Sequence, residues 1–127
     1  MIHRRTRPEQ DLHRAVWKFL RVAMPDGCMA WHHPAGGLRP SAEAAIMKGL
    51  GTVPGLPDFF FCYWSRLYGI ELKTARGRLS MDQVAAHQAL RNAGCDVEVC
   101  RSLEEVEAAL RKWRIPLRAS LLGRVAA

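Results

Sequence analysis

Three charged residues lie in two otherwise largely apolar segments in the middle of the sequence. Asp58 opens the run DFFFCYW at 58–64, and Glu71 and Lys73 lie within the alternating segment YGIELKT at 68–74. Because side chains alternate between the two faces of a strand, Glu71 and Lys73 share a face. A hairpin that brings Asp58 beside Glu71 would gather two carboxylates and one ammonium at one end of a sheet.

Such a group of charges suits phosphoryl chemistry. Two neighbouring carboxylates repel each other, and this repulsion favours the binding of a divalent cation. Oxygen ligands at a partly open site suit Mg²⁺ or Mn²⁺, which keep several waters and bind substrate phosphate. Lys73 beside that cation would hold the attacking water or neutralise phosphoryl charge. The alternative is a surface Asp58 near a Glu71–Lys73 pair that faces solvent, with no catalytic role.

Hydrophobic periodicity and capping residues predict the elements that hold these side chains. The two central strands are joined by a short hairpin turn at 65–67. The predicted helices lie at about 8–23, at 41–50, between the cap Ser80 and Gly94, and between the cap Ser102 and Pro116; the predicted strands lie at 28–33, 58–64, 68–74 and 96–100. This order predicts an α/β domain with a small central sheet covered by helices.

Charge points to a partner of the opposite sign. The 127 residues include 19 Lys and Arg against 12 Asp and Glu, a net charge of +7 with a pI near 9.8. This balance is typical of nucleic-acid binding, although many small proteins are basic without such a role. The excess basic residues are spread along the chain, so only the folded structure could bring them together on one face.

Length and apolar patterning limit the organisation of the chain. The sequence is the size of one domain, and no apolar run approaches the roughly 18 residues that suggest a membrane span. The basic start, Met1 to Arg7, leads into an amphipathic stretch and not into a signal-peptide core, so we expect a cytoplasmic protein. The four cysteines form no C-x-x-C pair, which favours free thiols over a zinc site.

Three motifs, taken in order, resemble the VRR-NUC family, a branch of the PD-(D/E)XK nucleases. They are GTVPGLPD at 51–58, IELK at 70–73 and GRLSMDQ at 77–83. The resemblance runs from Glu9 to about Glu105. It implies a single domain over residues 1–127, with a restriction-endonuclease-like core at about 6–113, a small mixed sheet flanked by helices, and a C-terminal tail at 114–127.

The resemblance also implies roles for single residues. Asp58 and Glu71 match the metal ligands, with the backbone carbonyl of Leu72 as a third ligand. Lys73 matches the catalytic lysine, and Gln83 matches a glutamine that contacts the active site from the following helix. Gln83 also has the spacing of a helix-capping residue, and both roles are compatible.

Glu9 matches an acidic residue of the first helix that reaches the metal directly or through water. Its spacing from Thr6 also predicts a capping box, which leaves its role open. The loop after the first strand departs from the family, because HHPAGG at 32–37 replaces the common asparagine-glycine pair. His33 there is either a DNA or metal contact or a polar group at a strand end. Candidate phosphate contacts are Arg39, Lys48, Arg76 and Arg78.

The expected activity is metal-dependent hydrolysis of DNA with Mg²⁺ or Mn²⁺. Small stand-alone members of the family resemble phage-type, homodimeric Holliday-junction resolvases, so we expect a homodimer acting on branched DNA in a bacterial or phage-infected cell. The apolar residues after the last helix, Ile115, Leu117, Leu121, Leu122 and Val125, either contact a partner subunit or fold back over the domain. The alternatives are a nicking or flap-type nuclease of a repair assembly and a non-catalytic DNA-binding module.

Overall fold

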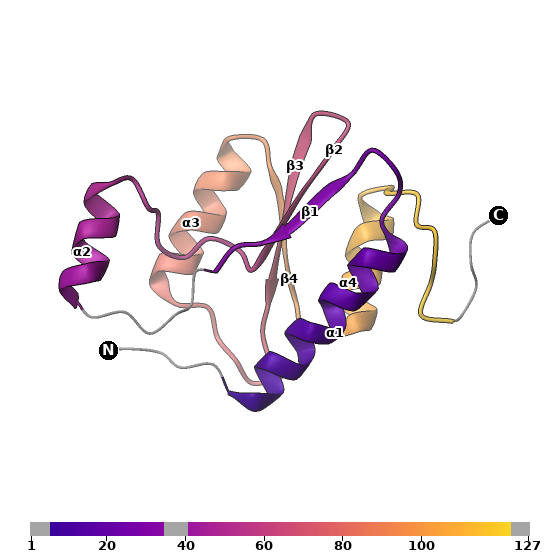
Figure 1. The fold of residues 1–127 in the computed structure, drawn as a ribbon, viewed down its shortest axis with the longest axis horizontal. Coiled ribbons are helices and arrows are strands. Elements are labelled where there is room, and N and C mark those ends of the chain that lie inside the picture. The colour runs from indigo at the N-terminus through magenta and orange to yellow at the C-terminus, as the bar shows by residue number, and fades with distance from the viewer. Residues whose placement is uncertain (1–5, 35–40, 123–127) are drawn as a thin grey trace.

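The computed structural model describes residues 6–34 and 41–122, and Figure 1 shows their arrangement. A four-stranded sheet in the order β1-β2-β3-β4 pairs antiparallel, antiparallel and parallel. Its strands are β1 (Met29–His32), β2 (Phe59–Tyr63), β3 (Arg66–Leu72) and β4 (Asp96–Cys100). The helices are α1 (Arg7–Ala23), α2 (Ser41–Gly49), α3 (Met81–Asn92) and α4 (Leu103–Lys112). The predicted mixed α/β architecture is confirmed.

Helices cover both sides of the sheet. α1 and α4 lie together on one side, and α3 lies on the other, with α2 beyond it (Figure 1). The core between the sheet and the α1–α4 pair contains Val16, Leu20, Phe59, Phe61, Ile70, Val106 and Leu110, each at most 1% exposed. Full burial of one such side chain contributes about 1.5–3 kcal/mol, so these contacts hold the central strands firmly.

The β2–β3 hairpin sets the geometry of the chemical centre. Its register pairs Phe59 with Ile70, so the next position brings Asp58 beside Glu71. The turn is shorter than predicted: Trp64 and Ser65 both have positive φ, 51° and 61°, as expected for a two-residue turn that matches strand twist. β3 therefore begins at Arg66, inside the segment that the sequence suggested for the turn.

Two apolar residues of the segment after α4 belong to the core. Ile115 and Leu117 are buried with the α1 and α4 side chains, and the Arg118 backbone N–H donates to the Ala23 carbonyl at 2.7 Å. Of the two outcomes expected for this segment, these residues show folding back over the domain. Leu122 is 85% exposed. Val125 lies outside the described residues. No helix among the described residues is long and apolar enough to cross a membrane.

Gly55 docks the loop before β2 against α3. It has φ +82°, and a Cβ at this position would overlap the Asp82 carbonyl group and lie 2.6 Å from the Gln83 backbone nitrogen. Only glycine allows the loop backbone to approach the helix start this closely. This contact fixes α3 relative to Asp58, three residues further along the chain.

Gly55→Ala should therefore destabilise the fold more than the same change at Gly27. Gly27 has nearly the same φ, +81°, but its added Cβ would meet nothing within 4 Å. Gly27→Ala should cost about 1–2 kcal/mol from the left-handed backbone alone. Gly55→Ala adds a backbone overlap and should cost at least about 1 kcal/mol more. Urea denaturation of both variants measures the difference; equal losses would show that the loop and helix separate without cost.

Candidate active site

Asp58 is a buried carboxylate that joins three strands. It lies just before β2 and is 5% exposed. Its Oδ2 accepts a 2.7 Å hydrogen bond from the backbone N–H of Leu72, the last residue of β3. Its backbone carbonyl accepts from the His33 N–H at 2.8 Å and lies 2.9 Å from His32 Nδ1. The end of β1 and the end of β3 are thereby tied to one residue.

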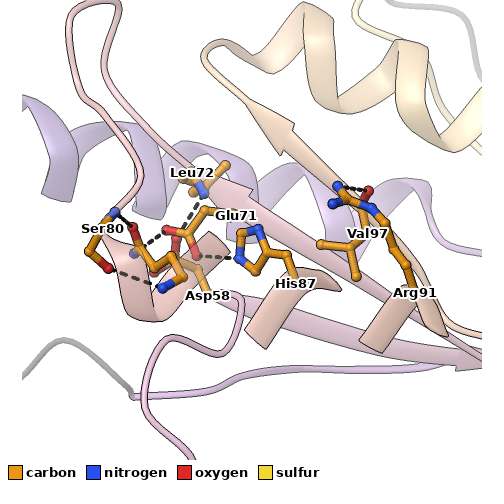
Figure 2. Close-up of polar contacts among 8 residues, drawn as sticks. Asp58, Glu71, Leu72, Ser80, His87, Arg91 and Val97 are labelled. Atoms are coloured by element: carbon orange, nitrogen blue, oxygen red, sulfur yellow. Dashed lines mark hydrogen bonds and ion pairs between the residues drawn. The ribbon is translucent and has the colours of Figure 1, made fainter. Parts of the chain in front are cut away.

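Glu71 is a second buried carboxylate, 3% exposed, and α3 contacts both of its oxygens. The Gln83 side-chain amide donates to Oε2 at 3.3 Å, and Nε2 of His87 lies 3.5 Å from Oε1. Figure 2 shows the two carboxylates converging next to the first turns of α3. Their burial excludes the alternative in which Asp58 and Glu71 face solvent as surface charges.

Gln83 caps α3 and also contacts Glu71, while its role in an active site stays a prediction. Its Oε1 accepts from the Ser80 backbone N–H at 2.9 Å, and its own N–H donates to the Ser80 hydroxyl at 3.1 Å. This capping box satisfies two backbone donors at the start of α3. It also orients the amide, because an oxygen held by Ser80 turns the NH₂ group toward Glu71.

Lys73 follows β3 directly and is partly buried. Its backbone N–H donates to the Cys100 carbonyl at 3.0 Å, which extends the parallel pairing by one residue. Beyond it, the Arg101 guanidinium donates to the carbonyls of Thr74 and Gly77 at 2.7 and 2.6 Å. Arg101 therefore holds the loop that follows the Glu71–Lys73 segment.

His87 contacts Glu71 and was not singled out by the sequence analysis. It lies one helical turn after Gln83, on the same face of α3, and is 1% exposed. Burial, followed by the positive charges of Arg91 and Lys73, lowers its pKa below the usual value. Its contact with Glu71 is therefore one between a neutral imidazole and a carboxylate at neutral pH. The spacing from Gln83 was the available sequence signal.

The other predicted residues lie in varied settings. Glu9 forms the expected capping box of α1, with 3.4 Å between the Thr6 backbone nitrogen and its Oε2, and its role toward a metal stays a prediction. His33 is partly buried, and its ring is nearly perpendicular to that of Phe60, with 6.0 Å between the ring centroids. Arg39 lies outside the described residues. The side chains of Lys48, Arg76 and Arg78 are exposed, as phosphate contacts require.

The donor atoms present fit a small hard cation. Asp58 and Glu71 supply carboxylate oxygens from adjacent positions of one hairpin, the ligand type that Mg²⁺ and Mn²⁺ prefer. Within residues 6–34 and 41–122, no group of three or more His, Cys, Asp or Glu side chains is arranged to hold a metal. The pair therefore fits an ion that keeps waters or binds substrate oxygens, and not a closed all-protein cage.

Comparison with known proteins identifies the fold. No family model matches the sequence, and no curated protein matches it. A solved structure described as a VRR_NUC domain protein has a TM-score of 0.64 and 18% identity, over 87% of this chain and 90% of its own. A second, described as a VRR_NUC domain, has a TM-score of 0.58 and 15% identity, over 85% and 99%. The chain therefore has the restriction-endonuclease-like fold of the VRR_NUC domain that its motifs predicted.

Proposed function

We propose that this chain is a VRR-NUC nuclease that hydrolyses phosphodiester bonds of DNA with Mg²⁺ or Mn²⁺. The observation that carries the proposal is the pair of buried carboxylates, Asp58 and Glu71, at one end of the sheet with Lys73 directly after β3. Burying charged groups costs several kcal/mol unless a partner offsets it. The fold of the VRR_NUC domain and the net charge of +7 support the same reading.

Each site residue has a task that follows from its position. Asp58 and Glu71 would hold the cation, with the Leu72 carbonyl as a further ligand. Such a cation, when bound, polarises a water and offsets charge on the phosphodiester. Lys73 would orient that water or stabilise phosphoryl charge. Gln83 keeps the Glu71 carboxylate in one orientation through its 3.3 Å hydrogen bond.

A non-catalytic DNA-binding module is the competing function. The buried carboxylates disfavour it, because negative charge next to phosphates opposes binding unless a cation lies between them. A nicking or flap-type nuclease uses the same site and differs only in the DNA that it accepts. Metal-dependent cleavage of a plasmid separates the catalytic functions from simple binding.

Asp58→Asn and Glu71→Gln should each reduce cleavage by at least about a hundredfold, the upper end of what losing an outer-shell group costs at a metal site. Both changes keep the side-chain volume and remove one of two neighbouring negative charges. Without metal, the melting temperature should therefore hold or rise. Plasmid cleavage in Mg²⁺ and thermal denaturation in EDTA are the measurements. Near wild-type cleavage by either variant would contradict the site assignment.

Lys73→Ala should lower the cleavage rate by about 10²–10³, the effect of losing one group that stabilises transition-state charge. DNA affinity in Ca²⁺ should change little, because 18 other basic residues remain of the 19. Arg76→Ala is the matched control, since it removes the same charge from an exposed position three residues away. It should weaken binding slightly and leave the rate of bound complexes unchanged. Equal effects of the two variants would remove the special role of Lys73.

We further propose a homodimer that prefers branched DNA. One domain carries one site, and symmetric cutting of a junction needs two sites related by a twofold axis. With the core positions of Ile115 and Leu117 established, α2 is the better candidate for the dimer surface. None of its nine residues is buried against the described part of the chain. Ile46 within it and Leu50 directly after it are 64% and 81% exposed. A helix this short is marginal in water, so packing against a second copy would stabilise it.

Light scattering at moderate salt should give twice the mass of one chain. The double variant Ile46→Glu with Leu50→Glu should give a monomer, because it places two charges on the proposed surface. Leu122→Glu is the control: it introduces a charge at another residue of similar exposure, 85%, and should leave the dimer intact. A wild-type monomer would exclude the homodimer. Equal cutting of duplex and four-way junction would exclude the preference for branched DNA.

A further inference from the structure

His87 lies in the interior of the domain and has no place in the proposed chemistry. Its side chain is 1% exposed, and its ring nitrogens make no hydrogen bond of good geometry with any described residue. The polar contact that it does make is the 3.5 Å approach of Nε2 to Glu71 Oε1. Burying an unsatisfied imidazole is costly, and an apolar side chain of similar volume would fill the same space more favourably. A structural role in packing therefore does not explain the choice of histidine.

α3 presents two polar groups to one carboxylate. Gln83 and His87 are four residues apart, so both lie on the same helix face. The Gln83 amide approaches Oε2 at 3.3 Å. His87 approaches the other oxygen, Oε1, at 3.5 Å (Figure 2). With one oxygen contacted, rotation about the last side-chain bond remains possible. Contacts to both oxygens restrict that rotation. They therefore fix the orientation of the Glu71 carboxylate relative to the neighbouring Asp58.

The Gly55 contact makes this arrangement rigid. The loop backbone meets the start of α3 at Asp82 and Gln83, which fixes the position of the helix along its axis. The capping box then sets the Gln83 amide, and His87 follows at a fixed distance of one turn. The position of the Glu71 carboxylate is thus determined by a helix that is itself held against the loop leading to Asp58.

We propose that His87 is a positioning residue that orients the Glu71 carboxylate for the divalent cation, through Nε2. This inference rests on the proposed function, since it needs Glu71 to bind that cation. Groups that orient metal ligands typically contribute 10–100-fold to metal affinity or activity. His87 itself does not touch the cation or the DNA.

The test compares four variants by Mn²⁺ binding without DNA, measured from the free Mn²⁺ signal in electron paramagnetic resonance. His87→Leu fills the space without a donor and should weaken Mn²⁺ binding by about tenfold or more. His87→Gln places an amide nitrogen near the position of Nε2 and should restore affinity to within about threefold of wild type. His87→Asn places its amide near Nδ1, away from Glu71, and should not restore it. Glu71→Gln provides the baseline without the ligand charge.

A second readout separates positioning from packing. In the cleavage reaction, His87→Leu should lower kcat at saturating Mn²⁺ and leave KM for DNA unchanged, because the DNA-contacting surface is untouched. His87→Gln should recover most of kcat. If His87→Leu does not fold, the comparison of Gln with Asn still decides, since both are polar and differ in where the amide lies.

The outcomes distinguish the two proposals. Wild-type Mn²⁺ binding no tighter than that of Glu71→Gln overturns the proposed function, and the role of His87 with it. Wild-type binding that depends on Glu71 but is unchanged within twofold in folded His87→Leu overturns the positioning role alone. Equal affinities of the Gln and Asn variants also overturn it. A loss in Leu and Asn with recovery in Gln supports it.

Discussion

The burial of two carboxylates side by side is the constraint on which the rest of this structure depends. Asp58 and Glu71 are 5% and 3% exposed, and each removes a charge from water at a cost of several kcal/mol. The fold offsets part of that cost with directed donors: the Leu72 backbone N–H for Asp58 and the Gln83 amide for Glu71. These contacts come from β3 and α3, so the charges can be buried only when both elements are in place.

Packing of the hydrophobic core offsets the remaining cost of burying the two carboxylates. Phe59 and Ile70, the residues next to the two carboxylates, are paired across the hairpin and fully buried. Their packing against α1 and α4 fixes the hairpin register. A slip of one residue would turn every side chain of β2 to the opposite face and separate Asp58 from Glu71. The same hairpin register therefore buries the apolar face and places Asp58 beside Glu71.

Two loops beside the site are held by contacts to their backbone. The loop before β2 meets the start of α3 at Gly55, and the loop after β3 is held by the hydrogen bonds of Arg101 to Thr74 and Gly77. Backbone contacts of this kind leave the exposed side chains, such as Arg76, available for a negatively charged partner. Under the proposed function, rigid support beneath exposed basic side chains would suit binding of a phosphate backbone next to the carboxylate pair.

Local patterns in the sequence predicted much of this protein. The alternation around Glu71, the apolar run after Asp58 and the capping pairs at Thr6 and Ser80 predicted the strands and helices that are observed, because these signals act within a few residues. The same patterns predicted the convergence of Asp58 with Glu71, since a short hairpin leaves few possible registers. The turn itself was placed one to two residues late, because Trp64 and Ser65 are unusual residues for positive φ.

Only the tertiary structure decided the remaining features. The four-residue spacing places His87 on the same face of α3 as Gln83, but nothing local indicates that this face is buried against Glu71. Its contact with Glu71 depends on how α3 packs against the sheet. The same holds for Ile115 and Leu117, whose apolar character was evident but whose partner, the α1–α4 side of the core, was not. A sequence specifies which side chains need burial or a partner, whereas packing over long distances along the chain decides which partner each one finds.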